Sequence, residues 1–299
     1  MQEQNKSQKP ISVNWHFWPW CNMKCKFCFA TFNDVKKILP KKLALKVPSM
    51  LKEAGTEKLT FVGGEPMLSP YIGELLVEAK NQELLTKIVS NGTGFTESFL
   101  NKYSSYIDQV SLSIDSSINE ICRRLGRGIG FHVDNIILTS KLLKKYKISL
   151  QINTTVTRLT INEDMHSLLD ELNPFRWKVF QVLPVKGQND GIEKLLISNS
   201  EFQKFKQTHL DLSYVVFEDN TLMTGSYIML DPIGRFFDNT TGKHLYSESI
   251  FNVGVLEAFS QITWKIERFH QRDGFYYRRT RNKYFNINKR NNIRELKGC

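Results

Sequence analysis

Three closely spaced cysteines are the residues in this sequence whose types and spacing point most specifically to chemistry. Cys21, Cys25 and Cys28 follow a C-x₃-C-x₂-C spacing and account for three of the five cysteines. Iron–sulfur clusters and structural zinc ions take four protein ligands, so three thiolates in one loop leave one coordination position open. An open position lets a cofactor or substrate bind the metal directly. The alternative is a zinc loop completed by a nearby histidine such as His16.

A second motif follows a predicted strand at residues 58–62. Gly63, Gly64 and Glu65 lead into a proline there. Glycines allow a close backbone approach and positive φ angles, and Glu65 adds a carboxylate. Alone, this segment is equally consistent with a tight turn. Together with the cysteine loop it resembles the radical S-adenosylmethionine (SAM) superfamily, whose [4Fe–4S] cluster binds SAM at its open iron, and zinc becomes improbable.

Composition limits the class of protein. The chain has 299 residues, of which 41% are hydrophobic and 24% charged, a globular profile. No apolar run is long enough to span a membrane, and no signal peptide is recognisable. An odd number of cysteines, three of them clustered, argues against a secreted disulfide scaffold and favours a cytoplasmic location. The formal net charge of +11 favours an anionic partner.

Strands that alternate with helices must position these motifs. In the first strand the apolar side chains share one face, while Asn14 and His16 lie on the polar face just before the cysteine loop. Such alternation predicts a parallel sheet with right-handed crossovers. We count six βα units ending near residue 184, which matches the partial (β/α)₆ barrel of the radical SAM superfamily. The predicted strands are 11–17, 58–62, 84–90, 109–115, 150–156 and 177–183, and the predicted helices are 43–54, 96–106, 133–145 and 162–172.

Three regions follow from this pattern. We expect a disordered N-terminus at residues 1–10, the barrel at 11–184, and a C-terminal extension at 185–299 that covers the active site. Residues 265–297 hold 11 Lys or Arg against 3 Asp or Glu, with interleaved aromatic residues. This basic tail is consistent with phosphate or base contacts, with a solvated disordered segment, or with a segment that orders over a bound triphosphate.

The resemblance narrows when further motifs are included. Over about residues 11–260 the chain resembles the viperin family of radical SAM enzymes, and its shorter prokaryotic-type members in particular. These members have no membrane helix. The motifs that carry the resemblance, in chain order, are Asn14-x-His16-Phe17, Leu125-Gly126-Arg127-Gly128, Asn173-Pro174-Phe175-Arg176-Trp177-Lys178-Val179-Phe180-Gln181, Ser226-Tyr227, Leu230-Asp231 and Val253-Gly254-Val255.

This resemblance implies a reaction. A 5′-deoxyadenosyl radical takes the C4′ hydrogen of a nucleoside triphosphate, and the 3′-hydroxyl leaves as water. The product is a 3′-deoxy-3′,4′-didehydro nucleotide that terminates RNA chains, an antiviral activity. The implied substrate is CTP, UTP or GTP, and the implied electron donor is a flavodoxin or ferredoxin. Neither a membrane nor a stable nucleic-acid complex is expected.

Two alternatives remain open. The chain could be another radical SAM enzyme that modifies RNA or a peptide, for which the basic tail is the main argument. Peptide-modifying members usually carry a second cysteine-rich domain, and only Cys299 lies beyond Cys122. A non-catalytic metal-binding or nucleic-acid-binding module would leave the combination of the two motifs unexplained.

The resemblance also implies residue roles. The cluster ligands are Cys21, Cys25 and Cys28. The cofactor-binding residues are Gly63, Gly64, Glu65, Ser90, Asn91, Ser113, Arg127 and Asn153. The substrate-binding residues are Asn14, His16, Arg158, Arg176, Lys178 and Arg235. Tyr227 takes the place of a candidate hydrogen-atom or proton donor. One departure concerns Gln151, where the family commonly has a lysine, so the basic residue that compensates in phosphate binding is left open.

Overall fold

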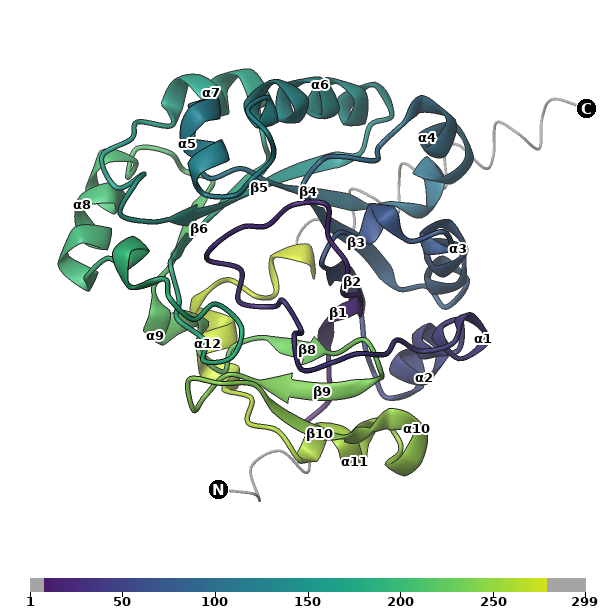
Figure 1. Cartoon of the computed structure of the whole chain (residues 1–299). Coiled ribbons are helices and arrows are strands. Elements are labelled where there is room, and N and C mark those ends of the chain that lie inside the picture. Colours follow the sequence, from purple (N-terminus) through teal and green to yellow (C-terminus); the bar gives the residue numbers. More distant parts are fainter. Residues whose placement is uncertain (1–7, 279–299) are drawn as a thin grey trace, which may run out of the picture.

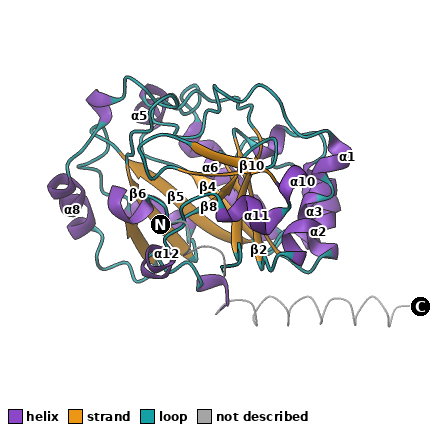
Figure 2. Ribbon diagram, turned by 90° about the horizontal axis from the view of Figure 1, so that it is seen from below, coloured by secondary structure: helices purple, strands orange, loops and turns teal. Residues whose placement is uncertain are grey.

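A curved ten-stranded sheet forms the centre of the molecule (Figure 1). The computed structural model describes residues 8–278. Its strand order is β10-β9-β8-β1-β2-β3-β4-β5-β6-β7, and every neighbouring pair from β8 to β7 is parallel. The β9 strand pairs antiparallel with β8, and β10 with β9. The sheet is curved, with helices on its outer side (Figures 1 and 2), so it is the expected partial barrel.

The helices and strands of the structure can be compared with the predicted ranges. The strands are β1 (Ser12–Trp18), β2 (Lys58–Gly63), β3 (Leu85–Ser90), β4 (Gln109–Ser113), β5 (Ser149–Val156), β6 (Arg176–Gln181), β7 (Val215–Glu218), β8 (Ile228–Leu230), β9 (Arg235–Asp238) and β10 (Leu245–Ser249). The α-helices are α1 (Lys41–Ala44), α2 (Val47–Glu53), α3 (Ile72–Asn81), α4 (Glu97–Tyr103), α5 (Asn119–Arg124), α6 (His132–Lys145), α7 (His166–Leu172), α8 (Asn199–Thr208), α9 (Asn220–Met223), α10 (Ile250–Val253), α11 (Val255–Ser260) and α12 (Ile266–Gln271). Short 3₁₀ helices occupy Pro66–Leu68, Ser104–Tyr106 and Glu193–Leu195.

All six predicted strands are present, and the sheet continues beyond them. β7 and β8 are four and three residues long, too short to give a periodic sequence pattern, yet they extend the parallel sheet at both ends. The predicted helix at 43–54 is two helices, because Pro48 begins a new turn within α2. The helix expected from residue 162 begins at His166. The domain boundary at residue 184 stays a prediction, since the sheet itself runs across it.

The two faces of each parallel strand have different roles. In β1, Val13, Trp15 and Phe17 are buried in the core between the sheet and the helices. Asn14 and His16 point the other way and line the cavity inside the barrel. Successive side chains alternate between faces, so each strand contributes apolar groups to the core and polar groups to the cavity.

The C-terminal segment closes the end of the barrel opposite the cysteine loop. Gln109 is the first residue of β4, and its Oε1 accepts a hydrogen bond from the Tyr276 hydroxyl at 2.6 Å. Arg278 pairs with Glu57, which directly precedes β2. Residues 272–278 therefore lie against the N-terminal ends of the strands. We call this end of the cavity the floor, and the end at the cysteine loop the mouth.

Two expectations reach beyond the described residues. Residues 1–7 of the predicted disordered N-terminus and residues 279–299 of the basic tail lie outside them. Within the described part, Pro10 is attached to the barrel, because its carbonyl accepts a hydrogen bond from Thr56 Oγ1 at 2.7 Å. Among the described helices, none combines the length and apolar character that crossing a bilayer requires.

Candidate active site

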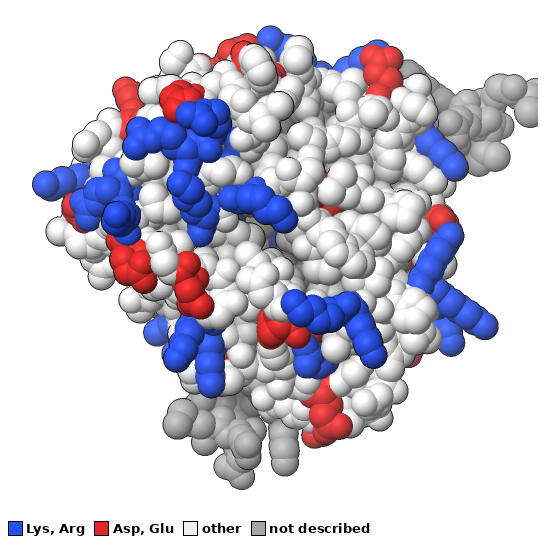
Figure 3. Space-filling model, viewed as in Figure 1, with Lys and Arg blue, Asp and Glu red and all other residues white. Residues whose placement is uncertain are grey.

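A single cavity of about 760 Å³ connects the mouth to the floor. It is lined by most of the residues named from the sequence. Figure 3 shows the face that surrounds the mouth; exposed Lys and Arg gather on its left side, and its centre is largely uncharged. The predicted residues that line the cavity are Asn14, His16, Cys21, Cys25, Cys28, Gly63, Gly64, Ser90, Asn91, Ser113, Arg127, Asn153, Arg176, Lys178 and Tyr227.

The cysteine loop is held in place through its backbone. The amide of Lys24 donates to the carbonyl of Gly126 at 3.1 Å, and the amide of Lys26 donates to Leu125 at 3.0 Å. Gly126 has a φ of +82°, and a Cβ there would lie 2.0 Å from the Lys24 carbonyl oxygen. Only glycine permits this approach. The turn after α5 thus positions the loop that carries the thiols.

The three thiols fit an iron–sulfur cluster better than a single zinc ion. All three are free and face one cavity. A structural zinc would need a fourth protein ligand beside them, whereas three thiolates leave one iron of a [4Fe–4S] cluster open for a cofactor. Burial raises the pKa of Cys25 to about 12, so metal binding must displace its proton.

The proposed zinc partner His16 has a different environment. Its ring lies edge-on to Phe29, Phe32 and Phe237, with centroids 5.2–6.1 Å away. Burial and the neighbouring His244 lower the pKa of His16 to about 3. His16 is therefore a neutral side chain in an aromatic wall of the cavity.

Glu65 joins the glycine segment to the end of β3. Its carboxylate accepts hydrogen bonds from Ser90 Oγ at 2.7 Å, from the Asn91 amide at 2.7 Å and from the Met67 amide at 3.0 Å. Burial raises the pKa of Glu65 to about 7, although these bonds oppose the shift. The carboxylate is fully buried and is not part of the cavity wall. Its direct contact with SAM stays a prediction, while its visible role is to hold Asn91 beside the cysteine loop.

A buried ion pair supports the opposite side of the mouth. Arg127 Nε donates to Asp115 Oδ2, and Asp115 Oδ1 accepts from the Thr155 amide at 2.8 Å. The guanidinium of Arg127 also lies 5.6 Å from the Phe27 ring centroid, within the cysteine loop. Asp115 was not singled out from the sequence as a site residue. The sequence feature that could have identified Asp115 is its position at the end of the polar face of the predicted strand 109–115.

The floor concentrates positive charge. Among the described side chains, Arg176 pairs with Asp273 at 2.6 Å and Lys178 pairs with Glu218, whereas Lys58 forms no ion pair. Burial and the charge of Arg272 lower the pKa of Lys58 well below its ordinary value. We call the five buried cations of this region the floor cations: Lys58, Lys87, Arg176, Lys178 and Arg272.

Tyr227 belongs to a hydrogen-bonded group with Lys178 and Glu218. Its hydroxyl donates to Glu218 Oε2 and accepts from Lys178 Nζ, both at 2.5 Å. Arg272 lies over its ring, 3.6 Å from the centroid. Burial and the Glu218 carboxylate raise the pKa of Tyr227, so the phenol keeps its proton. Glu218 was missed from the sequence because β7 was too short to recognise.

Two predicted substrate residues are not brought into the cavity. Arg158 forms an ion pair with Glu201 at the start of α8. Arg235 pairs with Asp231 at 2.7 Å across the β8–β9 turn. Neither lines the cavity, because each guanidinium is held by a carboxylate elsewhere. The structure therefore lends no support to a substrate contact for either arginine.

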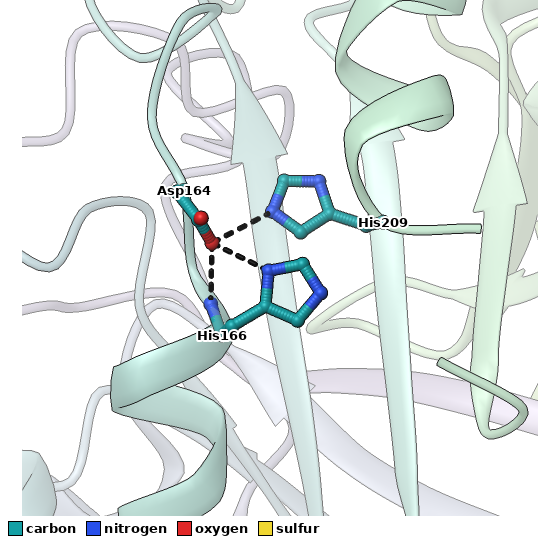
Figure 4. Close-up of side chains that lie close together, drawn as sticks. All are labelled: Asp164, His166 and His209. Carbon is teal, nitrogen blue, oxygen red and sulfur yellow. Dashed lines mark hydrogen bonds and ion pairs between the residues drawn. The ribbon is translucent and has the colours of Figure 1, made fainter. Parts of the chain in front are cut away.

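A separate cluster on the outer side joins α7 to α8 (Figure 4). His166 Nδ1 lies 2.5 Å from Asp164 Oδ1, and its Nε2 lies 3.1 Å from Asp211. His209 Nε2 accepts from the Met165 amide and its Nδ1 donates to the Phe205 carbonyl. Although the geometry would allow a metal ion, every ring nitrogen already has a partner. This cluster is consistent with an ion-paired imidazolium rather than a metal site.

Comparisons with known proteins agree with this geometry. Residues 15–172 match the family model described as the radical SAM superfamily. The S-adenosylmethionine-dependent nucleotide dehydratase of Flammeovirga pacifica is 44% identical over 275 residues, 89% of this chain and 95% of that protein. The S-adenosylmethionine-dependent nucleotide dehydratase RSAD2 of Danio rerio is 39% identical over 280 residues, 89% of this chain and 78% of that protein.

Solved structures share the fold at low sequence identity. Streptococcus suis SuiB bound to precursor peptide SuiA has a TM-score of 0.69 at 16% identity, covering 85% of this chain and 65% of that one, just under two thirds. The enzyme anSMEcpe with bound AdoMet has a TM-score of 0.62 at 17% identity, covering 87% and 80%. The partial barrel with a three-cysteine loop at its mouth defines a radical SAM protein. Within that superfamily, the chain belongs to the S-adenosylmethionine-dependent nucleotide dehydratases, the viperin family.

The close contact at Gly126 leads to a prediction about cluster assembly. Gly126→Ala should push the cysteine loop away from its support and lower iron and sulfide incorporation after anaerobic reconstitution. Gly128→Ala is the matched control, because its φ of +76° carries similar strain but its Cβ meets nothing closer than 3.6 Å. Equal iron content in the two variants would contradict the proposed support.

The ion-paired His166 leads to a prediction about pH. The hydrogen bond to Asp164, together with Asp211, raises the pKa of His166. The folded state therefore binds the proton on His166 more tightly than the unfolded state does. The added free energy of unfolding is fully present below the unfolded pKa of about 6.5. It is lost as the pH rises through the higher pKa of the folded state. His166→Gln should lower the free energy of unfolding more at pH 6 than at pH 9. The control is His270→Gln, at an exposed ring without a carboxylate partner among the described residues; in denaturant titrations the difference between pH 6 and pH 9 should be larger for His166→Gln than for this control.

Proposed function

We propose that this protein converts a nucleoside triphosphate to its 3′-deoxy-3′,4′-didehydro form, using a [4Fe–4S] cluster and SAM. The observation that carries the proposal is one cavity with a three-cysteine loop at the mouth and buried cations at the floor. The names of the relatives at 39–44% identity support the same reaction. When bound, the cluster and SAM supply the radical that removes the C4′ hydrogen, after which the 3′-hydroxyl leaves as water.

The residues at the mouth fit the cofactors. Cys21, Cys25 and Cys28 would hold the cluster. Gly63 and Gly64 line the cavity with half-buried backbone beside the loop, where a SAM amino group would be bound. Ser113 and Asn153 line the same part of the cavity, with Arg127 behind the loop. These assignments explain why a buried polar surface surrounds the three thiols.

The floor fits the phosphates of the substrate. Five buried cations share this region with two carboxylates, those of Glu218 and Asp273. A polyanion that entered the barrel would relieve the repulsion among the cations. Along β3, Lys87 precedes Ser90 by three positions, roughly 10 Å at 3.3 Å per residue, and lies on the floor side of it. A nucleotide extended along the barrel would thus place its sugar between the cysteine loop and the Tyr227 hydroxyl, with its phosphates directed toward Lys87 and Arg176.

This arrangement disfavours the alternative substrates. The floor cations are buried inside the barrel, where a mononucleotide can reach but a nucleic-acid backbone cannot. The likeness to peptide-bound SuiB is at 16% identity and concerns the fold. We assign CTP, UTP or GTP as substrate and a flavodoxin or ferredoxin as electron donor. A cytoplasmic location and the absence of a stable nucleic-acid complex stay predictions.

Product analysis tests the proposed function. Reduced, reconstituted protein incubated with SAM and CTP, UTP or GTP should yield 5′-deoxyadenosine and a nucleotide lighter by the mass of one water. Cys25→Ala should abolish both products, whereas Cys122→Ala should retain them because Cys122 is buried on α5 away from the cavity wall. If 5′-deoxyadenosine forms but no nucleotide loses water, the cofactors are right and the substrate is wrong.

Tyr227 is proposed to supply the proton with which the 3′-hydroxyl leaves as water, while the flavodoxin or ferredoxin supplies the one electron that converts the sugar radical to product. Its phenol is protonated and accepts a hydrogen bond from Lys178, which can return a proton after transfer. Tyr227→Phe should leave SAM and nucleotide binding and 5′-deoxyadenosine formation intact, while dehydrated product falls about 10²–10⁴-fold. Mass analysis of nucleotide product per 5′-deoxyadenosine measures this ratio. A ratio equal to that of the wild type would show that Tyr227 only lines the cavity.

A further inference from the structure

Lys87 is a buried lysine whose visible partners are all neutral. It lies on the inward face of β3 and is 4% exposed. Its Nζ donates to Gln151 Oε1 at 2.8 Å and to the Tyr276 hydroxyl at 3.1 Å. Among the described residues it forms no ion pair with a carboxylate. Two hydrogen bonds leave the third N–H of an ammonium available to a ligand.

Burial of such a group is costly unless something compensates for it. An ammonium removed from water without an opposite charge is strongly destabilised. Burial and the nearby charge of Lys58 lower the pKa of Lys87 well below its ordinary value. The hydrogen bonds from Lys87 hold it in one orientation without neutralising it. This combination is typical of a group positioned for a charged ligand.

The groups around Lys87 are also available for an anion. Thr60 lies next to Lys87 in the register of β2 and β3, and its buried Oγ1 has no partner in the described structure. The Nε of Arg176 is likewise buried without a partner. Both residues line the cavity. Hydroxyl and guanidinium donors beside an ammonium match the oxygens of a phosphate group.

The position along the barrel indicates which phosphate would be bound. The sugar must lie within reach of the cysteine loop for its C4′ hydrogen to be removed. Lys87 lies three positions before Ser90 along β3, on the floor side of the cavity, where it contacts the C-terminal Tyr276. Among the three phosphates of a nucleotide extended toward the floor, the one farthest from the sugar reaches this depth.

We propose that Lys87, oriented by Gln151 and Tyr276, binds the terminal phosphate of the substrate and makes the site selective for triphosphates. This inference rests on the proposed function and adds a specificity-determining residue to it. Neither the comparisons nor the sequence motifs assign a role to Lys87. Lys87 would also supply the positive charge that Gln151 lacks where the family commonly has a lysine, because Lys87 contacts Gln151 directly.

Binding measurements on the reconstituted protein with SAM, without reductant, test this assignment. Isothermal titration calorimetry would use CTP, CMP and inorganic tripolyphosphate as ligands. Lys87→Met should weaken binding of CTP and tripolyphosphate about 10- to 100-fold, as expected for loss of a charged hydrogen bond, and change CMP binding less than twofold. Lys144→Gln, which removes an exposed lysine on α6, is the matched control and should bind like the wild type.

Two further measurements separate ligand binding from a structural role. Lys87→Met should have an unchanged or higher melting temperature without ligand, because it removes a buried uncompensated charge. The double variant Lys87→Gln with Gln151→Lys moves the ammonium across a 2.8 Å contact and should recover most of the CTP affinity. A lower melting temperature with unchanged CTP affinity would show that Lys87 is structural and would overturn the inference.

The outcomes distinguish this inference from the proposed function. Equal CTP affinity of the wild type and Lys87→Met overturns the role of Lys87 and leaves the nucleotide substrate in place. A wild type that binds tripolyphosphate through Lys87 but no nucleoside triphosphate contradicts the proposed function and retains the phosphate subsite. A wild type that binds neither ligand overturns both.

Discussion

Positive charge buried inside an open barrel is the constraint on which the rest of this structure depends. Five buried basic side chains line the floor, and burial together with the neighbouring positive charges lowers the pKa of Lys58 and of Lys87 well below the ordinary value. The protein limits the cost of this burial with a few groups that come from distant parts of the chain. Although burial acts to raise the pKa of Glu218, the charges of Lys178 and Arg272 bring it below its ordinary value, so β7 supplies an anion.

The C-terminal segment, residues 272–278, also stabilises the buried positive charges at the floor. Asp273 pairs with Arg176, and the ring of Tyr276 lies 4.1 Å from the Arg176 guanidinium and 4.8 Å from Lys58 Nζ. Carboxylate and aromatic faces are the groups that stabilise cations away from water. The segment after α12 is therefore a structural part of the cavity. Without it, the ends of β2 to β4 would leave the floor open to solvent.

At the mouth, the geometry depends on contacts between backbones. Gly126 allows the turn after α5 to touch the cysteine loop, and Gly64 brings the end of β2 against the Trp20 carbonyl. Glu65 then fixes the end of β3 through two hydrogen bonds that reach Ser90 and Asn91. The ends of β2 and β3 and the turn after α5 are thus tied to the cysteine loop around the thiols. This explains how short, irregular segments can hold ligands for a cofactor in defined positions.

The cysteine loop and the floor cations lie at opposite ends of the cavity and depend on different parts of the chain. The fold is shared with SuiB and anSMEcpe at 16–17% identity, and it positions the three-cysteine loop. The charges at the floor come from side chains on the inward strand positions and from the C-terminal segment, which can change without altering the barrel. The sequence likeness of 39–44% to nucleotide dehydratases extends over 89% of the chain.

The sequence by itself determined the class of protein and the mouth of the site. The cysteine spacing, the glycine segment and the alternation of strands are local patterns, because a loop of eight residues or one strand is enough to display them. Six strands were recognised for this reason, and Cys21, Cys25 and Cys28 face one cavity as expected. The motif around Arg176 and Lys178 likewise indicated two cations that the structure brings to the floor.

Only the tertiary structure decided which charges meet. Lys87 and Gln151 are 64 residues apart, and Lys87 and Tyr276 are 189 apart, so no local pattern connects them. Arg158 and Arg235 have the same charge as Arg176 but are paired with carboxylates outside the cavity. A basic residue on a strand or turn gives no sign of which face it will occupy when the element is only three or four residues long. The contacts between distant strands and the C-terminal segment, which depend on barrel curvature and register, brought the floor cations together.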